Sequence, residues 1–370
     1  GEPRWILEPG HFQVEFDAMA MTVKFTKVED VVEHAGTAED PFHVASLFDM
    51  VYLHQRIQPG RVNYVVMDND IDMSTITNWT PLNLAENVVG DKAYMNWIDF
   101  DGKNHVIYNF RSQGSWYSGM FGVLCGGVRN VGFSGVDIDC TASGSGVLAG
   151  YAGHGNFSID GVTPVTTFEN VWVEGKLHVG SGYCGGLIGN VGGPTTVKNC
   201  FANVAISVDN AETVTGGIAG RISSDFSMEN VYAAGSVTGT AVTTGVIGAV
   251  KSSYTGHSIY KNVCVWNDSE QIFGAGKTED VMEGILYYDG TNFSDLQKAV
   301  VAWDPEVWSC TMEEGSYPVL KNIIGTGIGS VNAGTDQFRT DGTIYNLSGQ
   351  RVEKMQKGIY ILNGRKVLVK

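Results

Sequence analysis

The sequence has no long hydrophobic run, little proline, no excess of positive charge and no closely spaced cysteine pair. No apolar run approaches the ~18 residues of a membrane span, so we expect no transmembrane segment. Lys and Arg number 24 against 40 Asp and Glu, which gives a formal net charge of −16. This balance argues against a nucleic-acid partner, because phosphate binding needs clustered cations. The absence of any CxxC gives no zinc-ligand spacing, and whether the six cysteines form disulfides stays open.

Glycine is abundant where proline is scarce, with 48 Gly and 9 Pro in 370 residues. There is no three-residue glycine period, which excludes collagen. Hydrophobic residues make up 43% and aromatic residues 11% of the chain, enough to build a core, so the chain is not disordered. The composition favours an acidic, glycine-rich, all-β protein.

The glycines are concentrated in an internal repeat, with 29 of the 48 in residues 119–275. A short glycine-containing motif recurs five times and is followed each time by an Asn between a charged and an apolar residue. The motifs are GMFGVL, GVLAGY, GGLIGN, GGIAGR and TGVIGA, and the Asn triplets are RNV, ENV, KNC, ENV and KNV. A repeat of about 20–50 residues indicates a solenoid.

The segments between the glycines are rich in Val, Ile and aromatic residues and show no helical periodicity. A right-handed parallel β-helix fits this pattern best, with one coil per repeat and coils about 4.8 Å apart. The residue after each repeat Asn is expected to form one inward stack, and the glycines to permit close approach between coils. The expected stack is Val131, Val171, Cys200, Val231 and Val263.

The flanking segments complete the expected organisation. Residues 1–35 are a lead-in, and residues 36–325 form the β-helix with its repeats centred on 119–275. Residues 43–56 predict an amphipathic capping helix for the N-terminal end, and the tryptophan-rich residues 281–325 a C-terminal cover. Residues 326–342 have linker composition, and 343–370 predict a β-hairpin tail whose positive charge is opposite to that of the body.

The repeats GGLIGN…KNCFANVAIS and GGIAGR…ENVYAAGSVTG resemble the GLUG repeats of bacterial surface β-helix proteins. The lead-in GTAEDPFHVAS, YVVMDNDIDMS, NWTPLN and FDGKNHVIYNF and the closing WDPEVW…SYPVLK are also similar to that family. The resemblance covers roughly residues 36–322. The last 28 residues resemble the C-terminal sorting segments of type IX secretion in Gram-negative bacteria. Together these resemblances imply export to the outer surface or the medium and a role in adhesion.

One candidate metal site lies in the YVVMDNDIDMS segment. Asp68, Asp70 and Asp72 alternate along a predicted strand and would project three carboxylates from one face, a row that suits Ca²⁺. The alternative is that these side chains hydrogen-bond neighbouring turns. No other cofactor is expected.

One candidate ligand-binding row lies two positions after each repeat Asn, directly after the inward stack. If the stack points inward, Trp172, Phe201 and Tyr232 point outward and form an aromatic ladder on three consecutive coils. Such a row suits contact with sugar rings or a protein surface. The alternative is that the rings stack on one another and stabilise the coils.

We therefore expect a non-catalytic, secreted or cell-surface adhesion module that contacts an extracellular glycan or a host or bacterial surface protein. No catalytic residue is assigned, because the eight histidines form no HxH or HExxH pattern. The alternative is a polysaccharide lyase or glycoside hydrolase on the same scaffold, with Asp99 and Asp101 or Asp137 and Asp139 pairing with acids of other coils. Fold analogy alone supports that alternative.

Overall fold

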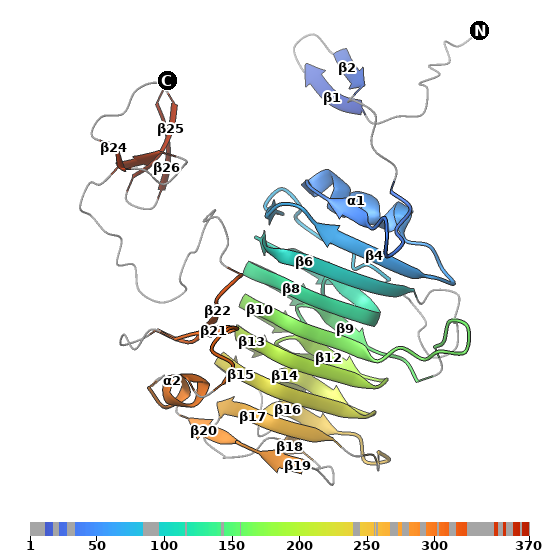
Figure 1. The fold of residues 1–370 in the computed structure, drawn as a ribbon, viewed down its shortest axis with the longest axis vertical. Helices are drawn as coiled ribbons and strands as arrows, with labels where there is room; N and C mark the ends of the chain where they lie inside the picture. The colour runs from blue at the N-terminus through green and yellow to red at the C-terminus, as the bar shows by residue number, and fades with distance from the viewer. Residues whose placement is uncertain are drawn as a thin grey trace. The chain divides into compact units, whose positions relative to one another are not determined.

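The computed structural model describes a mostly β chain with a large parallel, solenoid-like sheet system (Figure 1). The described residues are 12–17, 22–27, 34–83 and 96–323, except 115–116, 142–143, 156, 240–244, 255, 257, 267–272, 276–280, 289–293, 302 and 311–315. In the C-terminal unit they are 344–346, 351–352, 358–362 and 365–369. The chain divides into two compact units, residues 1–329 and 330–370. Neither helix in these ranges is long and apolar enough to cross a membrane.

Parallel strands from successive coils form a first sheet. Its members are β3 (Phe42–Val44), β4 (Val62–Met67), β5 (Ile71–Asp72), β6 (Trp97–Tyr108), β7 (Arg111–Gly114), β8 (Phe121–Cys140), β10 (Thr166–Val179), β13 (Thr195–Val208), β15 (Phe226–Thr238), β17 (Ile259–Trp266), β19 (Val281–Glu283) and β20 (Leu286–Tyr288). The strands pair in register from coil to coil, so equivalent repeat positions stack in rows.

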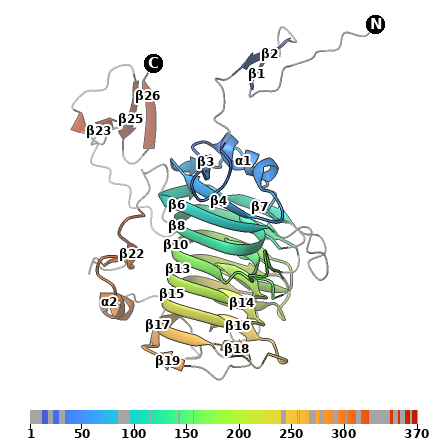
Figure 2. The same cartoon turned by 45° about the vertical axis from the view of Figure 1, so that its right-hand side comes forward.

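A second parallel sheet runs along the same stack (Figure 2). It begins in the first residues of β8 and continues through β9 (Ala149–Ala152), β11 (Tyr183–Gly185), β12 (Ile188–Val191), β14 (Val214–Ile222), β16 (Gly245–Val250) and β18 (Phe273–Ala275). The repeat glycines lie here. A Cβ atom on Gly220 would come within 2.5 Å of the Gly189 carbonyl oxygen, and one on Gly248 within 2.5 Å of the Gly220 oxygen. The predicted close approach between coils is therefore confirmed.

Inward-facing side chains of the two sheets form the main core. The expected stack Val131, Val171, Cys200, Val231 and Val263 is fully buried, which confirms its inward direction. Burial raises the pKa of the Cys200 thiol to about 12, so this cysteine is a small protonated core residue. None of the six cysteines, all within the described ranges, forms a disulfide.

The repeat asparagines form a continuous ladder through the stack. Asn130, Asn170, Asn199, Asn230 and Asn262 all have φ between 51° and 56°, the left-handed region that Asn tolerates better than most residues. The amide Nδ2 of each donates to the Oδ1 of the Asn one coil earlier, at 2.8–3.1 Å. At the start, Asn130 Nδ2 donates to Asp101 Oδ1 at 3.0 Å. Each Asn of the ladder therefore supplies both the left-handed turn of its own coil and a hydrogen bond to the coil before it.

A helix and a covering segment flank the stack. Helix α1 (Leu47–Arg56) lies at the end of the stack where β3 and β4 lie, and it buries Met50 and Leu53 (Figure 1). It is shorter than the expected 43–56 because Phe42–Val44 form β3, and Ser46 accepts the Asp49 N–H at 3.3 Å as its N-cap. Beside the first sheet lie α2 (Ser294–Val301) and the antiparallel pair β21 (Trp308–Ser309) and β22 (Val319–Leu320).

Two smaller elements complete the chain. β1 (Phe12–Asp17) and β2 (Thr22–Lys27) form an antiparallel pair within the lead-in. In the C-terminal unit, β23 (Ile344–Asn346), β24 (Arg351–Val352), β25 (Gly358–Leu362) and β26 (Arg365–Val369) form a four-stranded antiparallel sheet, in which β25 and β26 make a hairpin.

Replacement of one ladder residue tests how much the ladder contributes to stability. Asn199→Gly keeps the left-handed turn but leaves Asn170 Oδ1 and Asn230 Nδ2 without their partners, so we expect the free energy of unfolding to fall by roughly 2–4 kcal/mol. Asn199→Ala adds the strain of a Cβ at positive φ, about 1 kcal/mol more. Urea denaturation measures both. Equal losses for the two variants would contradict the role assigned to the turn.

Candidate functional site

The three carboxylates of the predicted metal site do not converge. The expected continuous strand is broken after β4, since residues 68–70 bend before β5, and the alternation that would place all three on one face is lost. Asp68 contacts His43 Nδ1 at 2.9 Å, and Asp70 accepts the Val106 N–H at 2.9 Å. Asp72 accepts Asn109 Nδ2 at 2.8 Å. Within the described ranges no group of three or more His, Cys, Asp and Glu is arranged to hold a metal ion. The expectation of a shared carboxylate face is therefore wrong.

The aromatic ladder exists, but it is covered. The rings of Trp172 and Phe201 stack at 6.0 Å and 9°, and those of Phe201 and Tyr232 at 4.9 Å and 3°. Phe201 is 1% exposed and Tyr232 is fully buried. The expected open platform is therefore wrong for these two residues, while Trp172 is half-buried.

Residues 294–323, here called the cover, bury the ladder. Trp308 and Tyr317 pack on Phe201, Trp172 Nε1 donates to the Ile323 carbonyl at 3.1 Å, and the Tyr232 hydroxyl donates to the Pro318 carbonyl. The cover begins later than expected, because residues 281–288 still pair with β17 as β19 and β20. Leu296, Val300, Trp303, Trp308, Leu320 and Ile323 join the ladder in a second hydrophobic cluster. In this arrangement the aromatic row is a packing element.

The acids considered for catalysis are paired with cations on neighbouring coils. Arg129 contacts both Asp99 and Asp101, and Lys176 Nζ lies 3.2 Å from Asp137. Burial disfavours the charged form of Asp101, but the Lys103 N–H, the Asn130 amide and the Arg129 charge together lower its pKa below the ordinary value of 3.8. A carboxylate held ionised in this way is a poor proton donor for glycoside cleavage.

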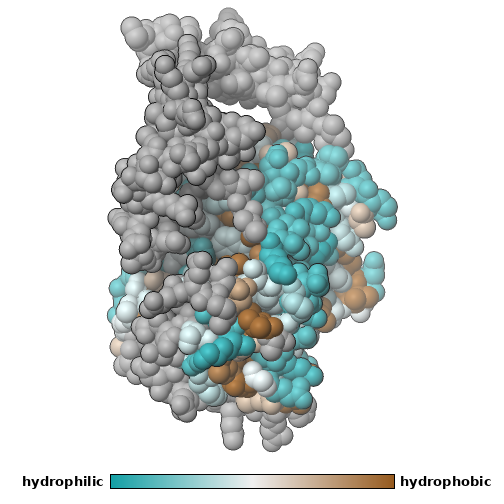
Figure 3. Space-filling view, turned by 60° about the vertical axis from the view of Figure 1, so that its left-hand side comes forward, coloured by the Kyte–Doolittle hydropathy of each residue, from teal (hydrophilic) through white to brown (hydrophobic). Residues whose placement is uncertain are grey.

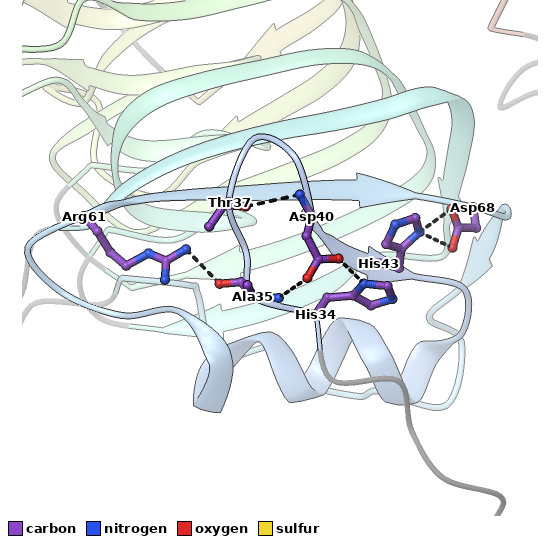
Figure 4. A network of polar contacts seen from close by, with 7 residues as sticks. All are labelled: His34, Ala35, Thr37, Asp40, His43, Arg61 and Asp68. Atoms are coloured by element: carbon purple, nitrogen blue, oxygen red, sulfur yellow. Dashed lines mark hydrogen bonds and ion pairs between the residues drawn. The ribbon is translucent and has the colours of Figure 1, made fainter.

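Histidine–aspartate pairs recur on the stack. At the end with α1, His34 Nδ1 lies 2.6 Å from Asp40, and its ring lies 4.3 Å from that of His43, which pairs with Asp68 (Figure 4). The His34 bond, then the Ala35 N–H, lowers the pKa of Asp40. These contacts tie the residues before β3 to the turn after β4, which is a structural use of the histidines.

His178 repeats the arrangement in the repeat region. Its two ring nitrogens contact Asp139 at 3.0 Å and Asp209 at 3.1 Å, and the bond to Asp139 is the largest cause of its raised pKa. In the second candidate acid pair, Asp137 therefore contacts Lys176 and Asp139 contacts His178.

The second sheet carries a cluster that the repeat pattern did not reveal. Tyr151, Asn190 and Arg221 occupy one register row on β9, β12 and β14. The ring centroids of Tyr117 and Tyr151 lie 5.4 Å apart at 82°, and the Arg221 guanidinium lies 4.6 Å from the Tyr183 ring centroid. All five are half-buried. We call them the tyrosine–arginine face.

Glycines form the floor of this face. A Cβ atom on Gly192 would fall within 2.1 Å of the Tyr151 ring, and one on Gly144 within 2.7 Å of the Tyr117 ring. Burial raises the pKa of Tyr117 and of Tyr151, so both hydroxyls stay protonated. The face therefore combines phenol hydroxyls, an amide and a guanidinium beside aromatic rings, a set that suits polar ring-shaped ligands. The residues come from coils of unequal length, which is why sequence periodicity did not group them.

No family model and no curated protein matches the chain. Its fold is similar to a crystal structure from Bacteroides ovatus described as a "putative immunoglobulin A1 protease". The TM-score is 0.62 with 24% identity, and the match covers 79% of this chain and 95% of that chain. At this identity the likeness shows the fold alone.

Substitutions in the aromatic ladder test its packing role. Phe201→Ala removes a ring enclosed by Tyr232, Trp308 and Tyr317, so we expect the free energy of unfolding to fall by about 3–5 kcal/mol. Tyr232→Phe loses one hydrogen bond to the cover, worth about 1 kcal/mol. Thermal unfolding measures both, and limited proteolysis should cut the cover faster in Phe201→Ala. An unchanged melting temperature for Phe201→Ala would show that the ladder does not hold the cover.

The Asp101 carboxylate makes the free energy of unfolding depend on pH. Its folded-state pKa lies below the ordinary 3.8, so its contribution is complete above that value and is lost as the pH falls through the folded-state pKa. Asp101→Asn should lower stability at neutral pH and flatten the decline below about pH 4. Denaturation across that range checks this; an unchanged slope would contradict it.

Proposed function

We propose that the chain is a non-catalytic interaction module, secreted or held at the outer surface of a Gram-negative bacterium, which binds carboxylate-bearing glycans through the tyrosine–arginine face. With this we propose the finer assignments: a right-handed parallel β-helix of the GLUG type, capped by α1, and a tail that serves as a type IX sorting segment. Calcium at Asp68, Asp70 or Asp72 has no part in this proposal.

The observation that carries the proposal is the set of contacts that Arg221 makes. Among the six cations of residues 119–275, Arg129, Lys176, Lys198 and Lys261 form ion pairs with carboxylates, and the exposed Lys251 forms none with a described residue. Arg221 instead lies over Tyr183, and in the described part of the chain no carboxylate pairs with it. A guanidinium on an aromatic ring keeps donors free for a bidentate contact with an incoming carboxylate. Although the chain carries a net charge of −16, such a cation attracts the carboxylate of an acidic sugar to this face.

Three further observations support the proposal. The likeness to the Bacteroides ovatus structure supports a β-solenoid fold, and the resemblance of the repeats to GLUG repeats supports export. Burial raises the pKa of Cys125, Cys184 and Cys264 to about 12, which makes these thiols poor nucleophiles. The acids that hydrolysis would need are held by cations, as described above. These points favour binding over catalysis.

Binding of defined sugars tests the proposal. Oligogalacturonate and sialyllactose should bind the full chain, and Arg221→Gln should weaken both by about tenfold or more, since a charge-assisted hydrogen bond is lost. Lactose, which has no carboxylate, should bind weakly to either protein. Isothermal titration measures the affinities, with Arg111→Gln as a control that removes an exposed cation from the first sheet.

The same incubations separate binding from catalysis. Release of sugar products would favour the lyase or hydrolase alternative, and cleavage of added immunoglobulin A1 would favour the activity named for the Bacteroides ovatus protein. Equal affinity of wild type and Arg221→Gln for the acidic sugars would overturn the assignment of the face.

A further inference from the structure

A row of alternating charges runs along the first sheet, one position before the asparagine ladder. Register pairs each member with the next, so every acid inside the row has a cation on both sides. Ion pairs form at 3.3 Å between Arg129 and Asp101, 3.6 Å between Lys198 and Glu229, and 3.3 Å between Lys261 and Glu283. The members in order are Asp101, Arg129, Glu169, Lys198, Glu229, Lys261 and Glu283.

The last member stands on a strand that is paired on one side within the described residues. Strand β19 pairs in parallel with β17, and all three of its residues are exposed. The Glu283 side chain is 64% exposed, the highest value among the paired charges of this row. Opposite charges on neighbouring strands stabilise a sheet and like charges destabilise it, so the next strand position favours a cation.

The hydrophobic core is also open at this strand. Met282 continues the inward row of Phe168, Val197, Met228 and Tyr260, which are at most 1% exposed, yet Met282 is 47% exposed.

The surface beside β19 is apolar as well. Val281 is 51% and Ile259 46% exposed on the outer side. Brown, apolar surface is visible in the lower half of Figure 3, toward the β17–β20 end of the stack in Figure 1. At the other end, α1 buries Met50 and Leu53 against the core.

We infer that β19 is a docking edge for an extended segment of another protein, which adds as a strand and places a Lys or Arg beside Glu283 and an apolar side chain over Met282. Strand addition supplies the main-chain hydrogen bonds, and the charge row sets the register. The inference is independent of the glycan proposal, because it concerns a different sheet and a different class of ligand.

A peptide copied from the chain's own coil tests the inference. The probe TVKNSFANV follows residues 196–204 with Ser in place of Cys200, and it carries Lys at the row position; the control peptide carries Glu there. Fluorescence anisotropy at low salt should show the Lys peptide binding the full chain at least about fivefold tighter than the Glu peptide. Glu283→Lys should reverse that order, whereas Glu212→Lys, an exposed acid in a loop, should preserve it.

Three results would overturn the inference. The first is an order of affinities that Glu283→Lys leaves unchanged, and the second is no binding of either peptide. The third is concentration-dependent self-association in sedimentation that Glu283→Lys abolishes, which would make a second copy the occupant of the edge. Met282→Ser, which removes the apolar contact but no charge, should weaken both peptides alike.

Discussion

The asparagine ladder is the constraint on which the rest of the stack depends. Each coil must turn at one residue in the left-handed region, and Asn accepts that backbone at low cost while its side chain bonds to the coil before it. A shift of one residue in any coil would remove both the turn and the amide bond. The inward row of Val131, Val171, Cys200, Val231 and Val263 is held in register by the same bonds.

Three rows of different chemistry follow from this one fixed point. The residue before each Asn lies outward and carries alternating charge, and the residue two positions after it lies outward and is aromatic in three coils. The aromatic row is covered by residues 294–323, whereas Tyr151, Asn190 and Arg221 on the second sheet are half-buried and all three residues of β19 are exposed. The periodic part of the molecule therefore builds the scaffold, while the proposed binding surfaces lie where the periodicity ends or the coils differ in length.

The repeated asparagines, the inward stack and the outward aromatic row were predictable from sequence because each depends on neighbours one coil away. The burial of Phe201 and Tyr232 was not, since it depends on residues such as Trp308, about a hundred positions later. The prediction for Asp68, Asp70 and Asp72 was wrong because alternating residues share one face only where the strand is continuous. The tyrosine–arginine face was not predicted because no repeat places Tyr183 beside Arg221. The sequence signal that points toward it is an Arg directly after a glycine motif in an acidic chain.

The charge row explains why the two ends of the stack differ. An alternating row with seven members has acids at both ends, Asp101 at the first and Glu283 at the last. Asp101 is enclosed, with its carboxylate bonded to Asn130 and within 3.2 Å of Lys103, whereas Glu283 pairs with Lys261 on one side and faces no described strand on the other. Beyond Asp101 the register row continues with Val66 on β4 and His43 on β3, so the charged part of the row does not reach the α1 end of the stack. The alternation therefore reaches an end of the stack only at β19, where the exposed Glu283 favours a neighbour of opposite charge.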